Sequence, residues 1–257
     1  MQASKKNLVF IHGLFQNSKS WEQWIPYFEA LGYTCHAPNY PCHEGEPAEL
    51  RRNIPKGLGK VSLNQVVKVY SDFIDTLDEK PVLIGHSMGG LVVQKLIAEG
   101  KGRSGICLSS APAQGIFTLT WSFIKANLPT LNPFAGSSPA LPSVKGYQYA
   151  FCNAQSLEEV TQEYEQYVVP ESRKIAWTSL LGQGKVPFRK AHAPLLIITG
   201  SKDNIIPPTI GKQTHKAYKD KNSRCDYKMF EGRTHNICHQ EDWEEVAGYI
   251  QNWLSAL

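Results

Sequence analysis

Short apolar runs alternate along the chain with longer segments whose apolar residues recur every three or four positions. The runs are short enough for buried strands, and the longer segments have the period of an amphipathic helix. The runs occupy residues 7–11, 33–37, 81–84, 105–109, 194–199 and 225–230. Strands that alternate with helices are typical of a parallel sheet covered on both faces. We therefore predict an α/β fold with about six mainly parallel strands.

The helical period is clearest at residues 61–77. A similar helix is predicted at residues 21–31, because residues that favour a helix N-cap precede it and Gly32 ends it. Residues 40–60 contain three prolines and three glycines with mixed charge, a composition that predicts a surface loop. Further helices are predicted at residues 91–99, 156–168, 171–181, 209–218 and 240–257.

The regular alternation breaks between the fourth and fifth apolar runs, in a segment too long for an ordinary connection. Residues 116–150 contain no Asp or Glu, only two lysines as charges, and several prolines that cut this part into short pieces. We interpret residues 112–190 as a cap inserted into a core made of residues 1–111 and 191–257. Its apolar side is expected to cover an active site. The alternative is an insertion that packs only on itself.

The sequence Gly85-His86-Ser87-Met88-Gly89 joins a predicted strand directly to a predicted helix. A serine at such a sharp turn has a strained backbone that holds its hydroxyl clear of the sheet, and the helix points its positive N-terminal end at the group attacked. Strand and helix come so close that a Cβ at either flanking glycine would clash. The segment resembles the nucleophile elbow of the α/β-hydrolase superfamily. The alternative for Ser87 is an ordinary β-turn serine.

The resemblance implies a serine, an acid and a histidine in that order along the chain. The serine hydroxyl needs a base to take its proton, and the histidine needs a carboxylate to fix its tautomer. Asp203 lies in the loop after the fifth apolar run, and His235 lies in the loop after the last one. Each follows a strand end of the kind where ligands bind in open α/β sheets. The alternatives are a turn residue for Asp203 and a surface loop residue for His235.

The resemblance also implies two backbone donors for the oxyanion of acyl transfer. The first is the N–H of Met88, which follows the nucleophile. The sequence His12-Gly13-Leu14 after the first strand matches the His-Gly-X motif of the superfamily, so the N–H of Leu14 is the second donor. Gly13 allows the backbone to turn inward. His12 is expected to hold this loop by hydrogen bonding, and His86 is expected to pack beneath the elbow.

Composition narrows the class of protein. Of the 257 residues, 42% are hydrophobic and 19% are charged, as in an ordinary globular domain. The net charge of +4 is spread along the chain, so nucleic acid is not expected as a partner. No apolar stretch approaches the roughly 18 residues of a membrane span. No signal peptide is visible in the sequence, so a cytoplasmic location is expected.

The cysteines and histidines offer further candidate chemistry. The six cysteines show no C-x-x-C spacing, and Cys35, Cys107 and Cys225 fall in strand-like segments, so free thiols are favoured over a disulfide framework. His239 lies four residues after His235, which invites a metal site, but a third ligand at a sensible spacing is missing. We expect neither a metal nor another cofactor.

The implied chemistry is hydrolysis of a carboxylic ester or lactone through an acyl-enzyme. The acid-free, aromatic-rich part of the insertion suggests an uncharged, apolar small molecule as substrate, and Phe117, Trp121 and Phe123 are expected to line its pocket. In length and opening strand the chain is also similar to plant methylesterases and hydroxynitrile lyases. Those lyases have Thr at the position of Gly13 and Lys at that of Asn236, so this sequence favours an esterase.

Other functions use the same fold. A lyase, a carbon–carbon bond hydrolase and an acyltransferase can employ the same three side chains. A ligand receptor can keep the fold with little turnover, and binding without turnover would distinguish it from an enzyme. The sequence does not determine the oligomeric state or the physiological ester.

Overall fold

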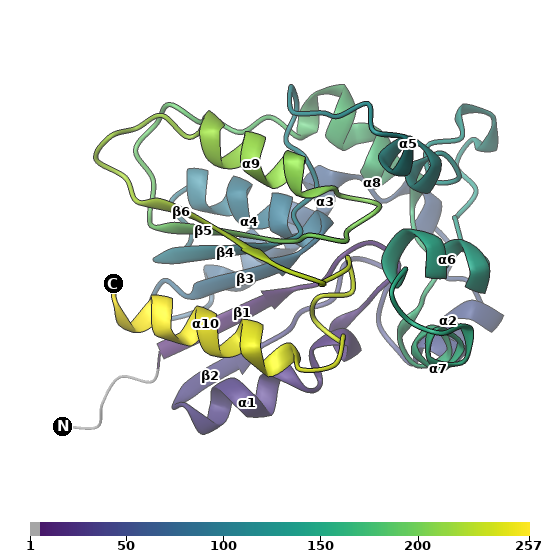
Figure 1. Cartoon of the computed structure of the whole chain (residues 1–257), viewed down its shortest axis with the longest axis horizontal. Helices are drawn as coiled ribbons and strands as arrows, with labels where there is room; N and C mark the ends of the chain where they lie inside the picture. Colours follow the sequence, from purple (N-terminus) through teal and green to yellow (C-terminus); the bar gives the residue numbers. More distant parts are fainter. Residues whose placement is uncertain (1–5) are drawn as a thin grey trace.

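The computed structural model describes residues 6–257, and a single sheet forms its centre (Figure 1). Neighbouring strands, in the order β2-β1-β3-β4-β5-β6, all pair in parallel. The strands are β1 (Lys6–Ile11), β2 (Tyr33–His36), β3 (Val82–His86), β4 (Ser104–Leu108), β5 (Leu195–Gly200) and β6 (Cys225–Phe230). The prediction of an α/β fold with six parallel strands is confirmed.

The order of the strands in the sheet reverses once, and β1 and β3 are the two neighbouring strands at the point of reversal. The chain passes from β1 outward to β2, returns to β3 on the other side of β1, and then proceeds without reversal to β6. In open parallel sheets such a reversal leaves a crevice at the carboxyl ends of the strands, where ligands bind. Ile11 pairs with Gly85 across the reversal. The segments that follow β1 and β3 therefore leave the sheet side by side.

Helices cover both faces of the sheet (Figure 1). They are α1 (Trp24–Ala30), α3 (Leu63–Ile74), α4 (Met88–Ala98), α9 (Pro208–Ala217) and α10 (Trp243–Ser255). Successive residues of a strand point to opposite faces. Val9 and Ile11 accordingly belong to the buried cluster with α3 and α4. Leu8 and Phe10 belong to the cluster with α1 and α10.

Residues 40–60 differ from the predicted loop, because they contain α2 (Pro47–Arg52) and the 3-10 helix η2 (Leu58–Lys60). Proline is favourable at the first helical position, where its missing N–H would have no partner in any case. The Arg51 side chain then ties α2 to the rest of the molecule by donating to the Val168 carbonyl at 2.7 Å. This long-range contact has no local signal in the sequence.

The helix predicted at residues 21–31 is shorter than expected. A 3-10 helix, η1 (Ser18–Trp21), precedes α1, which begins at Trp24. Proline is tolerated in the first turn of a helix but not in its interior. A helix that began at residue 21 would place Pro26 in its interior, whereas α1 has Pro26 as its third residue.

The segment from residue 112 to residue 190, here called the insertion, is helical and lies beyond the carboxyl ends of the strands (Figure 1). Its helices are α5 (Trp121–Asn127), η3 (Pro133–Ala135), α6 (Val144–Phe151), α7 (Leu157–Tyr167), α8 (Arg173–Thr178) and η4 (Ser179–Gln183). A buried apolar cluster joins the insertion to the core. In this cluster Tyr147 and Phe151 of α6 pack with Phe15 and Ile205.

Several smaller expectations can be compared with the structure. Helix α7 corresponds to the helix predicted at residues 156–168, and α8 with η4 corresponds to residues 171–181. All six cysteines are free thiols, as predicted. Within residues 6–257 no helix has both the length and the apolar character that crossing a membrane requires.

Candidate active site

Ser87 occupies the turn between β3 and α4 with φ 55° and ψ −117°, a conformation that L-residues rarely adopt. The close approach of strand and helix explains the glycines on either side. A Cβ on Gly85 would lie 2.2 Å from the Gly89 carbonyl oxygen, and a Cβ on Gly89 would lie 2.1 Å from the Ile11 carbonyl oxygen. The surrounding backbone therefore fixes the strained serine at the N-terminus of α4.

His235 and Asp203 form a buried pair at the ends of neighbouring strands. The Nδ1–H of His235 donates to Oδ2 of Asp203 at 2.7 Å, and both side chains are inaccessible to solvent. Asp203 Oδ1 accepts from the N–H of Ile206 at 2.7 Å, which orients the carboxylate. A proton held on Nδ1 leaves Nε2 of His235 as a base. Within residues 6–257, Nε2 has no hydrogen-bond partner.

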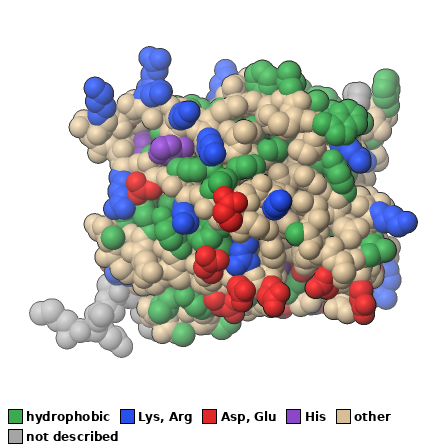
Figure 2. All heavy atoms as spheres, viewed as in Figure 1, with side chains coloured by type: hydrophobic (Ala, Val, Ile, Leu, Met, Phe, Trp, Pro, Cys, Tyr) green, Lys and Arg blue, Asp and Glu red, His purple; other side chains and the backbone are tan. Residues whose placement is uncertain are grey.

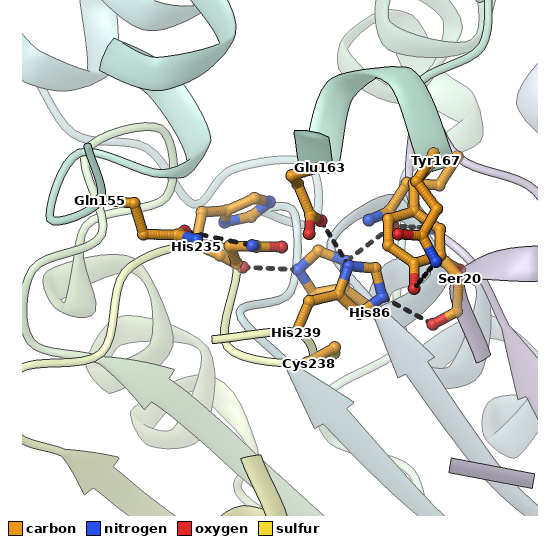
Figure 3. Close-up of polar contacts among 12 residues, drawn as sticks. Ser20, His86, Gln155, Glu163, Tyr167, His235, Cys238 and His239 are labelled. Carbon is orange, nitrogen blue, oxygen red and sulfur yellow. Dashed lines mark hydrogen bonds and ion pairs between the residues drawn. The ribbon is translucent and has the colours of Figure 1, made fainter. Parts of the chain in front are cut away.

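The His235 loop is tied to the elbow by its neighbour His86 (Figure 3). Nε2–H of His86 donates to the His235 carbonyl at 2.9 Å, and the two rings lie 4.7 Å apart. His86 immediately precedes Ser87, so this bond ties the His235 loop to the residue next to the serine. Ser87 Oγ and His235 Nε2 are not hydrogen-bonded here, and catalytic contacts of this kind commonly tighten when substrate binds.

The loop after β1 leaves one backbone donor free next to Ser87. The N–H of Gly13 donates to Gln16 Oε1 at 3.4 Å, and that of Phe15 donates to Glu171 Oε2 at 3.3 Å. Between them, the N–H of Leu14 has no acceptor in the described part of the chain, and neither has that of Met88. Leu14 and Met88 line the cavity that contains Ser87. Two unpaired donors therefore lie on the same cavity as the serine.

Gly13 and His12 shape this loop. A Cβ on Gly13 would lie 2.9 Å from the Ser87 Cβ, so glycine permits the loop to approach the elbow. His12 Nδ1–H donates to the Gly13 carbonyl at 2.9 Å, and Nε2 accepts from the N–H of Tyr40 at 3.1 Å. Burial, followed by the neighbouring His43, holds the pKa of His12 well below its usual value. His12 is therefore neutral and holds the loop by hydrogen bonds.

His86 is neutral for a similar reason. Its side chain is buried beneath the elbow, and burial, with the adjacent His235 as a smaller cause, holds its pKa well below the usual value. With the His86 proton on Nε2, its Nδ1 carries no hydrogen and only approaches Gln16 Oε1, at 3.1 Å, while that oxygen accepts from the N–H of Gly13. His86 thus bonds to the loop of His235 and contacts the loop after β1.

Sequence reasoning missed a second buried pair that supports the loop after β1. Nε2 of His43 lies 3.2 Å from Oε2 of Glu171, and both side chains are fully buried. Burial lowers the pKa of His43. The charge and the hydrogen bond of Glu171 together raise this pKa by a larger amount, so the pKa of His43 lies above its usual value. Glu171 also accepts from Phe15. These partners are more than 100 residues apart in sequence, so no local pattern could have paired them.

A cavity lies over Ser87 between the core and the insertion. It holds about 590 Å³ of atom-free space, including its opening, and none of the described residues that line it is charged. Phe151 lines this cavity and packs on His235, with ring centroids 5.2 Å apart. Asn127 and Ser179 are among the few polar residues of the wall. The cavity therefore suits an uncharged, apolar ligand.

The three aromatic residues predicted to line the pocket differ in position. Phe123 lines the cavity, whereas Phe117 and Trp121 are 63% and 74% exposed and do not line it. Trp121 and Phe123 are two positions apart in α5, which sets them about 200° apart around the helix axis. They cannot both face the cavity, and Phe117 precedes the helix. Figure 2 shows hydrophobic side chains exposed on this part of the insertion.

The ring nitrogens of His239 contact the insertion and the core, and neither contacts a candidate catalytic residue (Figure 3). Its Nδ1 lies 2.6 Å from Glu163 Oε1 of α7, and its Nε2 lies 2.6 Å from the Ser20 carbonyl oxygen. Among residues 6–257, no group of three or more His, Cys, Asp or Glu side chains is arranged to hold a metal ion. His239 therefore connects the insertion to the core.

Known proteins resemble this chain in sequence and in fold. The chain is 25% identical over 231 residues to a pyrethroid hydrolase of Sphingobium wenxiniae, covering 82% of this chain and 76% of that protein. A monoacylglycerol lipase from Paleococcus ferrophilus has a similar structure, with a TM-score of 0.70 and 24% identity over 97% of this chain and 94% of the lipase. A methylesterase from Arabidopsis has a TM-score of 0.71 and 16% identity over 98% of this chain and 100% of its own.

A model of a protein family matches most of the chain. Residues 8–249, which include all six strands except the first two residues of β1, match the model of the alpha/beta hydrolase family. This range also contains Ser87, Asp203 and His235. The chain belongs to the alpha/beta hydrolase family.

Proposed function

We propose that this protein is a serine hydrolase that cleaves carboxylic esters or lactones of uncharged, apolar small molecules. The observation that carries the proposal is the buried 2.7 Å bond between Asp203 and His235, which leaves Nε2 of His235 without a partner in the described chain. That bond fixes the tautomer that a general base needs. The bond from His86, the residue before the strained Ser87, to the His235 carbonyl supports a position of this base near the serine.

The chemistry follows in two balanced steps. Ser87 Oγ attacks the ester carbonyl while His235 Nε2 takes the hydroxyl proton, and the N–H groups of Leu14 and Met88 stabilise the oxyanion. Collapse of the tetrahedral intermediate breaks the bond to the alcohol, which leaves with the proton from His235. Water then gives a proton to His235 and attacks the acyl-enzyme. The acid departs, and the proton returns to Ser87.

The substrate class is inferred from the cavity walls and from relatives. The uncharged walls favour an apolar ligand, because an ionised group would lose its hydration there without a compensating partner. The relatives are named as a hydrolase of pyrethroids, a monoacylglycerol lipase and a methylesterase. We propose that the insertion acts as a cap that shields the reaction from water. Gly13 and Asn236 support an esterase over a hydroxynitrile lyase.

The test is hydrolysis of p-nitrophenyl acetate and butyrate by the parent protein, by Ser87→Ala and by the surface control Ser137→Ala. We expect turnover in the parent and in the control, and a loss of at least about 10⁴-fold in kcat in Ser87→Ala. A fluorophosphonate should label the parent and not Ser87→Ala. Binding of esters without turnover in the parent would indicate a receptor, and equal rates in parent and Ser87→Ala would refute the assignment of the nucleophile.

A further inference from the structure

A second cavity lies between the insertion and two residues of the core, Phe15 and Ile205, next to the cavity that contains Ser87. It holds about 570 Å³ of atom-free space, including its opening. Most of its wall comes from α5, α6, the start of α8 and the segments between them, and the rest comes from the core. Ser87, Leu14 and Met88 do not line it. This cavity is therefore separate from the reacting atoms.

The two cavities share part of their walls. Phe15, Thr130, Phe151 and Ile205 line both of them. Each of these four residues is more than nine-tenths buried, so they form an internal partition and not a surface rim. A chain that passes between these side chains would connect the serine with the second cavity without reaching solvent.

Most residues that line the second cavity are apolar and several are small, while Thr130, Ser143 and Arg173 add polar groups to its wall. Ala126 and Ala150, both more than nine-tenths buried, leave the space that larger side chains would fill. Arg173 is the single charged residue among the described residues that line it. Its Nη1 donates to the Pro129 and Thr130 carbonyls, which joins α8 to the segment after α5. The cavity thus offers mainly apolar contact area, and no carboxylate is among the described residues that line it.

We infer that the two cavities together bind one extended substrate, an ester with a long apolar chain whose far end occupies the second cavity. This inference rests on the proposed esterase function and narrows its substrate class. The chain is the acyl part or the alcohol part of the ester, because an alkyl group of either part presents the same chemistry to these walls. Each methylene moved from water into an apolar cavity is worth up to about fourfold in kcat/KM.

The experiment measures kcat/KM across two homologous series. In the first, p-nitrophenyl esters vary the acyl chain from acetyl to dodecanoyl. In the second, acetates of primary alcohols vary the alcohol chain, followed by titration of the released acid. We expect kcat/KM in one series to rise by more than tenfold between four and ten carbons, and that series identifies the part of the ester in the second cavity.

Variants then locate the chain. The readout is the ratio of kcat/KM for the decanoyl or decyl ester to that for the four-carbon ester. We expect Ala150→Leu and Ala126→Leu to lower this ratio by at least tenfold, because each variant fills space in the second cavity and leaves the first cavity unchanged. Ala176→Leu is the matched control, since Ala176 lines only the first cavity and should affect short and long esters alike. Ala48→Leu, on the exposed side of α2, controls for general effects.

A structure of the parent with a decyl phosphonate bound to Ser87 gives a readout that does not depend on a variant. The chain should pass between Phe151 and Ile205 into the second cavity. A chain that leaves toward solvent would overturn the inference, as would a flat length profile in both series or an equal fall in the ratio for Ala176→Leu. Such results would leave the esterase function intact if short esters are still cleaved, whereas failure to cleave any ester would refute that function itself.

Discussion

Replacement of Glu171 by Gln tests whether the buried carboxylate supports the candidate oxyanion loop. Both oxygens of Glu171 are in use. Oε2 accepts from the N–H of Phe15 at 3.3 Å and from His43 at 3.2 Å, and Oε1 accepts from the N–H of Ser172 at 2.6 Å. Glutamine has the same shape but only one acceptor oxygen. Its NH₂ group would therefore face at least one of these N–H donors.

The expected loss of stability follows from these contacts. A hydrogen bond to a charged group contributes about 1.5–3 kcal/mol, and a broken buried ion pair costs about 3–5 kcal/mol. Since Gln retains one acceptor, we expect the free energy of unfolding to fall by about 2–5 kcal/mol. Phe15 adjoins Leu14, the proposed oxyanion donor. Displacement of that donor should lower kcat by about tenfold to a hundredfold, less than the roughly 10²–10³ for complete removal.

Urea denaturation and steady-state hydrolysis of p-nitrophenyl acetate measure the two effects. The matched control is Glu165→Gln, a carboxylate of α7 that pairs with Arg51 but has 65% of its side chain exposed. An exposed pair contributes about 0–1 kcal/mol, so the control should keep both stability and kcat. If Glu171→Gln matched Glu165→Gln in unfolding free energy and in kcat, the proposed support of the oxyanion loop would be wrong.

Two further predictions concern buried pairs. Asp203→Asn should keep the thermal unfolding temperature within a few degrees but lower kcat by about 10⁴-fold, because His235 would take the wrong tautomer; a rate near that of the parent would move the acid elsewhere. Burial lowers the pKa of His239, but Glu163 raises it more, so its folded-state pKa lies above the usual 6.5. The resulting stabilisation is full below pH 6.5 and declines as the pH rises through the folded-state pKa. His239→Gln should therefore lose more unfolding free energy in urea at pH 6 than at pH 9, and an equal loss at both would contradict the charged pair.

Much of the fold could be predicted because its signals are local. A strand in a parallel sheet is buried on both faces and appears as a short apolar run, whatever its neighbours. The turn at Ser87 requires glycine at positions 85 and 89 because backbone atoms lie within 2.2 Å of where a Cβ would be. The order of elements then indicated which loops follow strand ends, and the resemblance to the α/β-hydrolase superfamily, which implies a serine, an acid and a histidine in that order, pointed to Asp203 and His235 in those loops.

The remaining features depend on contacts between distant segments. Glu171 and His43 are 128 residues apart in sequence, and an isolated acid or histidine carries no mark of its partner. The aromatic residues of α5 illustrate the same limit: their composition indicated an apolar wall, but only the packed helix placed Phe123 inside and Trp121 in solvent. The sequence by itself determined the strands of the sheet and the elbow, because each depends on neighbours along the chain, whereas the choice of candidate catalytic residues also used the family resemblance. The tertiary structure alone decided the buried pairs and the two adjoining cavities, because these arise from how the insertion packs on the core.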